Sequence, residues 1–84
     1  MDKEKFLNNI YDKVKNYVSL RNANFDGYNL GIYVEGDIIV DFFDSNNHYD
    51  ISRKDYFVNN LECIVINCTD KTESEVIEDI KKYI

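Results

Sequence analysis

The stretch that most constrains the fold is residues 28–44, YNLGIYVEGDIIVDFFD, in which apolar side chains alternate with other side chains along two segments. The alternating apolar positions are Leu30, Ile32 and Val34 in the first segment and Ile38, Val40 and Phe42 in the second. A spacing of two residues is typical of a β-strand with one buried face. The stretch therefore predicts a β-hairpin whose apolar side chains share a face.

The length of the hairpin loop decides which face each side chain occupies. A two-residue loop, Glu35-Gly36, would pair Val34 with Asp37 and would put the two apolar sets on opposite faces. A three-residue loop that includes Asp37 instead pairs Val34 with Ile38, and the apolar sets then agree. Because a slip of one residue moves a whole strand's side chains to the wrong face, we predict the three-residue loop. Gly36 or Asp37 would supply the positive φ that such a turn needs.

The same register gives the other face of the hairpin a mixture of aromatic, aliphatic and acidic side chains. It places Tyr33 opposite Ile39, Gly31 opposite Asp41, and Asn29 opposite Phe43. One explanation is a face half covered by another part of the domain, or ordinary scattered surface apolar residues. The other is a partner-binding patch with aromatic residues at its centre and carboxylates at its edge. The residues predicted for that patch are Tyr33, Glu35, Asp37, Ile39, Asp41, Phe43 and Asp44.

Three further elements are predicted outside the hairpin. Residues 2–16 carry apolar side chains at intervals of three and four, which indicates an amphipathic helix. Residues 61–68, LECIVINC, contain four consecutive apolar residues and predict a strand covered on much of both faces. Thr72 and Glu75 form a capping-box pattern, which predicts a last helix that runs to about Tyr83.

The remaining segments are predicted from turn residues and short patterns. Residues 19–27 predict a polar loop that ends in Asp-Gly. A turn at Asn46-Asn47 followed by residues 48–52 predicts a third strand of a meander. Residues 53–60 fit either a short helix capped by Ser52, which we favour, or an irregular crossing.

The order of these elements predicts an α+β fold. We expect a three- to four-stranded antiparallel sheet (meander), flanked by an N-terminal and a C-terminal helix packed on one face. The 84 residues leave room for one domain, residues 1–84, that buries roughly 60 to 65% of the extended surface. The element order resembles the double-stranded-RNA-binding fold, but Glu73 and Glu75 stand where that family has basic residues, so no membership is inferred.

The net charge of −6 is concentrated in one part of the chain. Residues 26–50 contain no lysine or arginine and carry six carboxylates, on Asp26, Glu35, Asp37, Asp41, Asp44 and Asp50. Direct binding of nucleic acid by this part is not expected, because affinity for phosphates comes largely from cations. No segment approaches ~18 apolar residues and no export signal begins the chain, so we expect a cytoplasmic protein without a membrane partner.

The chain has no pattern specific to catalysis, cofactors or metals. His48 is the only histidine, and its spacing to Asp50 and Cys63 matches no known catalytic arrangement. The carboxylates of the acidic stretch lack the alternation and central glycine of an EF-hand loop. Cys63 and Cys68 lie five apart on one predicted strand, so their side chains should point to opposite faces as free thiols. We therefore predict no enzyme, no cofactor and no metal.

Two functions remain open. The first is a non-enzymatic inhibitor whose acidic hairpin face occupies a basic surface of a partner protein, such as a nucleic-acid-handling complex, as phage anti-defence and anti-CRISPR proteins do. Charge would speed the encounter and the aromatic residues would hold the complex. The second is a homo-oligomeric accessory or structural subunit, for instance a homodimer, that uses the same mixed face against its own copy.

Overall fold

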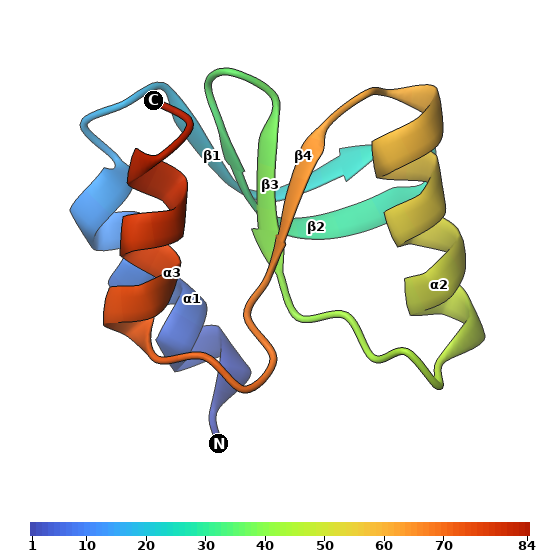
Figure 1. The fold of residues 1–84 in the computed structure, drawn as a ribbon, viewed down its shortest axis with the longest axis horizontal. Helices are drawn as coiled ribbons and strands as arrows, with labels where there is room; N and C mark the ends of the chain where they lie inside the picture. The colour runs from blue at the N-terminus through green and yellow to red at the C-terminus, as the bar shows by residue number, and fades with distance from the viewer.

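The computed structural model describes all 84 residues as three layers: a pair of helices, a four-stranded sheet, and a third helix on the other side (Figure 1). The strands are β1 (Ser19–Phe25), β2 (Tyr28–Val34), β3 (Ile38–Asp41) and β4 (Ile64–Asn67), and they follow this order across the sheet. The helices are α1 (Lys3–Val14), α2 (His48–Asp55) continued by the π-helix η1 (Tyr56–Asn60), and α3 (Glu73–Lys81). No helix is long and apolar enough to span a bilayer.

The terminal helices are confirmed with their caps. The Asp2 side chain accepts a hydrogen bond from the Lys5 backbone N–H at the start of α1. Thr72 and Glu75 form both hydrogen bonds of the predicted capping box at the start of α3. As predicted, α1 and α3 cover the same face of the sheet (Figure 1). Their apolar stripes and the inner side of the hairpin form the first core, which consists of Phe6, Leu7, Ile10, Val14, Ile32, Val34, Ile38, Val40, Phe42, Ile66, Cys68, Val76 and Ile80.

The predicted register of the β2–β3 hairpin is confirmed. Val34 pairs with Ile38, and Tyr33 pairs with Ile39. Both Gly36 and Asp37 have positive φ, at 98° and 61°, so the two candidate positions share the left-handed geometry of the turn. The β2–β3 pairing ends at Ile32 with Val40. The predicted pairs of Gly31 with Asp41 and of Asn29 with Phe43 therefore do not form.

The segment predicted as a polar loop is strand β1. Its turn to β2 is the dipeptide Asp26-Gly27, whose φ values of 54° and 92° suit a tight two-residue hairpin turn. The strand is polar because the edge of a sheet buries only part of each side chain. An Asp-Gly pair between two extended segments was the sequence signal for this hairpin.

The side chains of the β1–β2 hairpin change face halfway along its length. Arg21 reaches α1 and pairs with Glu4 at 2.8 Å, whereas Ala23 packs on the opposite side of the sheet. Asn22 between them has a φ of 58°, and the ladder skips its pair with Gly31. Beyond this point the hairpin packs over η1. The prediction that Leu30 shares a face with Ile32 and Val34 is therefore wrong, because Leu30 lies in the second core.

A second core lies on the other face of the hairpin, so of the two explanations for that face the one in which another part of the domain covers it is confirmed. It is formed by Leu30, Ile39, Phe43, Phe57 and Cys63. Phe57 of η1 is fully buried at its centre, and the Tyr28 ring packs edge-on to it at 6.3 Å. The two cysteines lie in different cores and are free thiols, as their spacing predicted.

The predicted third strand at residues 48–52 is wrong, because this segment begins α2. The Asn47 side chain caps the helix by accepting from the Asp50 backbone N–H at 3.0 Å. The helix preferred for residues 53–60 is confirmed as the end of α2 and η1, although the cap is Asn47 rather than Ser52. Since this helical segment crosses the sheet between β3 and β4, the two strands run parallel, and the antiparallel meander ends at β3.

Candidate partner-binding site

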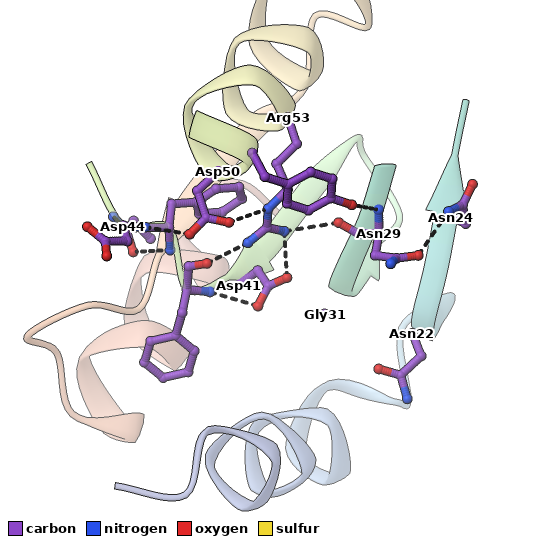
Figure 2. Close-up of polar contacts among 12 residues, drawn as sticks. Asn22, Asn24, Asn29, Gly31, Asp41, Asp44, Asp50 and Arg53 are labelled. Atoms are coloured by element: carbon purple, nitrogen blue, oxygen red, sulfur yellow. Dashed lines mark hydrogen bonds and ion pairs between the residues drawn. The ribbon is translucent and has the colours of Figure 1, made fainter. Parts of the chain in front are cut away.

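Arg53 is the one buried charged residue and organises the acidic end of the sheet (Figure 2). Its Nε donates to Asp50 Oδ1 at 2.9 Å, and its Nη1 donates to Asp41 Oδ2 at 2.8 Å. The guanidinium also lies 4.2 Å from the centre of the Phe43 ring. Planar, delocalised and weakly hydrated, a guanidinium suits such a buried position better than an ammonium does.

Arg53 also joins α2 to the ends of two strands through main-chain oxygens. Nη1 donates to the Asn29 carbonyl at 3.0 Å and Nη2 to the Phe42 carbonyl at 2.6 Å. Four of the five N–H groups of a guanidinium are thus used within the chain. Asp41 and Asp50, which the sequence left without a counter-cation, are therefore both paired with an arginine three residues beyond the acidic stretch, whose single positive charge offsets one of their two negative charges.

Two more of the predicted contact residues are internal. Ile39 is fully buried and Phe43 is only 4% exposed, both in the second core beneath α2 and η1. The expectation that these side chains form an open docking face is wrong, because the helical crossover between β3 and β4 covers them. Ile39 and Phe43 from the predicted patch thus belong to the protein's own interior, and Asp41 from its edge is paired with Arg53.

Asp44 is exposed but lies away from the other predicted carboxylates. It follows the end of β3, whereas Asp37 precedes its start. Its Oδ1 accepts from the Asn46 N–H at 2.8 Å, and its own N–H donates to Asp50 Oδ2 at 2.8 Å. Asp44 therefore shapes the loop before α2 and does not extend the group at the hairpin turn.

The structure does bring Tyr33 and Asp37 together, in a hollow of about 470 Å³ beside the β2–β3 turn. The lining residues come from both hairpins and from the segment before β4: Asn24, Phe25, Asp26, Tyr33, Asp37, Leu61 and Cys63. The Phe25 and Tyr33 rings meet edge to face with centroids 5.4 Å apart. Glu35, also exposed, belongs to the same turn as Asp37. We call these lining residues, together with Glu35, the turn site.

Each aspartate of the turn site accepts a hydrogen bond from a tyrosine. The Tyr33 hydroxyl donates to Asp37 Oδ1 at 2.8 Å, and the Tyr56 hydroxyl donates to Asp26 Oδ2. These bonds to carboxylates are the main reason that the pKa values of both tyrosines lie above their usual range. By donating these hydrogen bonds, the two hydroxyls fix the orientation of the carboxylates.

The turn site offers acceptors and aromatic faces to a cation. Neither Asp26, Glu35 nor Asp37 has an ion-pair partner in the chain, and all are exposed. An ionised carboxylate has about four lone-pair positions, so the single tyrosine bond on each aspartate leaves room for a further donor. A lysine or arginine side chain from outside would find both charge and π-faces here.

The thiols and the histidine do not combine into a reactive group. His48 is exposed at the start of α2, whereas Cys63 is buried in the second core. Burial raises the pKa of the Cys63 thiol, and burial raises that of Cys68 to about 12. No group of three or more His, Cys, Asp or Glu side chains is placed to hold a metal ion.

Three residues that matter here were not singled out from the sequence. Arg53 was hidden because its partners lie up to 24 residues away in the chain. Asp26 and Phe25 were placed in a loop, although the Asp26-Gly27 hairpin signal would have brought them to a strand end. Comparisons with protein-family models, with curated protein sequences and with solved structures found no match for this chain.

Proposed function

We propose that this protein is a non-enzymatic binding protein whose turn site receives basic side chains of a partner protein. The observation that carries the proposal is the contrast among its carboxylates. Asp41 and Asp50 are paired with Arg53, whereas Asp26 and Asp37 face a hollow without any cation. The aromatic lining favours arginine, which stacks on rings and donates to carboxylates at the same time.

The proposed role is that of an inhibitor. Surfaces that bind nucleic acids are rich in lysine and arginine, since these side chains neutralise phosphates. A protein that occupies such a surface excludes the nucleic acid, which is the mode of action expected of a phage anti-defence or anti-CRISPR protein. The three carboxylates of the turn site, on Asp26, Glu35 and Asp37, come from two separate hairpin turns and form no regular row, so they imitate a phosphate backbone only in part.

A homo-oligomeric subunit is the second candidate. Ile39 and Phe43 are not available for it, but Leu20 on the neighbouring strand is half exposed opposite Tyr33. Val18, just before that strand, is 65% exposed. These side chains continue the outer side of the hairpin, so a self-association through them would include the edge of the turn site.

The direct test uses an octa-arginine peptide as probe and amide chemical shifts as readout. We expect the largest shifts at Asp26, Tyr33 and Asp37, and loss of binding in the triple variant Asp26→Asn, Glu35→Gln, Asp37→Asn. The matched control removes three carboxylates elsewhere, in the variant Asp12→Asn, Asp70→Asn, Glu78→Gln. These control positions are all exposed.

The control variant has the same net charge as the site variant. Comparing the two therefore separates the effect of the turn site on peptide affinity from the effect of the protein's total charge. We expect the control to keep most of the wild-type affinity. Equal weakening of both variants would mean that only total charge matters, and the proposal would be lost. Light scattering over a range of concentrations tests the second candidate: a protein that stays monomeric counts against self-association.

A further inference from the structure

The free edge of β4 is the feature that the turn site does not explain. In Figure 1 this strand runs between α3 on one side and α2 on the other, at the end of the sheet order. Its sequence, Ile-Val-Ile-Asn, is mostly apolar and carries no charge and no proline. The only protection against pairing with another strand is its shortness.

The hydrogen bonds of β4 show which main-chain groups are free. The Ile64 N–H donates to the Asp37 carbonyl at 2.8 Å, and the Cys68 N–H donates to the Asp41 carbonyl at 2.9 Å. In a parallel pair the bonding residues alternate, so Ile64, Ile66 and Cys68 point their N–H and C=O groups toward β3. The corresponding groups of Val65 and Asn67 point away from the sheet.

The opposite edge of the sheet is not equivalent. Along β1 the ladder skips Asn22, whose positive φ of 58° breaks the regular extended backbone. A strand interrupted in this way is a poor template for continuous pairing. The free edge of β4 has no such interruption, so it is the better site for an added strand.

The two sides of the β4 edge carry opposite charge. A concave surface on the α3 side is lined by residues that include Lys71, Asp79 and Lys82, and Asp79 already pairs with both lysines. A concave surface on the α2 side includes Asp44 and Asp55. Lys54 is the only cation that lines it. A strand added at this edge therefore meets side chains of net positive charge on the α3 side and of net negative charge on the α2 side. We call these two groups of side chains the two rims.

Side chains of an added strand alternate between these two rims. On β4 itself, Ile66 joins the first core beneath α3, and Val65 packs against the second core beneath η1. Residues of a neighbouring strand follow the same alternation, because paired residues share a face. We propose that β4 accepts an extended segment of a partner protein in which acidic side chains, facing α3, alternate with basic side chains, facing α2.

A second copy of the chain does not fit this edge. Antiparallel pairing of two β4 strands about a two-fold axis places α3 beside α3 and α2 beside α2. Lys82 would then face its own copy, as would Asp55, and each molecule also carries a net charge of −6. Like charges facing each other oppose such a pair, whereas an alternating segment satisfies both rims.

The test uses two synthetic decapeptides with five lysines and five glutamates, one alternating and one with the residues in two blocks. We expect the alternating peptide to bind and to slow hydrogen exchange at the Val65 and Asn67 amides, and the block peptide to bind many-fold more weakly. Equal affinity of the two peptides, or binding without protection of these amides, would overturn the proposal.

A variant of the edge separates strand addition from simple attraction. Val65→Pro removes an outward N–H and leaves the ladder to β3 intact, so we expect it to abolish binding of the alternating peptide. Val65→Thr keeps the N–H and the branched shape and is the matched control, with binding retained. Should the proline variant fail to fold, Lys82→Glu supplies the second test, with several-fold weaker binding expected.

The outcomes also distinguish this site from the turn site. The variant Asp26→Asn, Glu35→Gln, Asp37→Asn should bind the alternating peptide as the wild type does. Loss of that binding would place the peptide in the turn site and refute strand addition at β4. A dimer in which the Val65 amide is protected without any peptide would equally overturn the proposal, in favour of self-pairing.

Discussion

Arg53 Nη1 lies 2.8 Å from Asp41 Oδ2, with the arginine on α2 and the aspartate at the end of β3. Both side chains are largely buried, at 7% and 17% exposure. This ion pair connects the helical crossover to the sheet and closes the face that holds the second core. Asp41 is therefore part of the protein's own structure and is not available to bind a partner.

Replacement of Arg53 by methionine should destabilise the fold strongly. Asp41 and Asp50 would remain as partly buried charges without a partner, a change that costs about 3 kcal/mol or more. We expect urea unfolding to show this loss. Lys54→Met is the matched control, since Lys54 is the exposed neighbour on the same helix and should change stability by less than about 0.5 kcal/mol. Adding Asp41→Asn to the methionine variant should restore part of the loss, and a stable single variant would contradict this account.

Replacement of Gly31 by alanine should also destabilise the protein, by about 1 to 3 kcal/mol. An added Cβ would lie 2.9 Å from Leu7 Cδ1 and 2.9 Å from the Val40 carbonyl oxygen. The leucine can move, but the backbone oxygen cannot without a shift of β3. Thermal unfolding measures the effect. Ala23→Gly on the paired strand serves as a comparison for the backbone contribution. An unchanged melting temperature for Gly31→Ala would contradict this prediction, because it would mean that the site accommodates the added Cβ without strain.

Stability should fall in alkali because of Cys68. Burial raises the pKa of its thiol to about 12 in the native state, against an ordinary value of 9.0 in the unfolded chain. The unfolded state therefore loses this proton first, and the contribution to stability is full below pH 9 and is lost between pH 9 and about 12. Urea titrations at several pH values should show a steeper decline for the wild type than for Cys68→Ala. Parallel curves would contradict the assignment to this thiol.

Removal of the cap at the start of α3 should cost about 1 kcal/mol. Thr72→Ala deletes the acceptor for the Glu75 N–H and leaves one end of the capping box open. Ser74→Ala, an exposed change within the same helical turn, is the control and should be close to neutral. Circular dichroism during urea unfolding gives both values. A Thr72→Ala variant as stable as the control would mean that packing of α3 on the first core holds the helix start by itself.

What the sequence determined by itself was local. Alternation fixed the β2–β3 register, because an error of one residue would bury the wrong face. The three- and four-residue spacing of apolar side chains predicted α1, and the capping box predicted the start of α3. Each of these signals is complete within a few residues. These elements also sufficed to place both helices on one side of the sheet.

The tertiary structure alone decided the other face. Segment 48–52 is compatible with either a strand or a helix. Asn47 caps the helix locally, and Arg53 connects α2 to distant strand ends. That choice made β4 parallel to β3, buried Ile39 and Phe43, and neutralised Asp41. No local pattern could show this, since burial and ion pairing depend on which distant segment arrives. The exposed Asp26 and Asp37 are without an ion-pair partner because no cation of the chain reaches them.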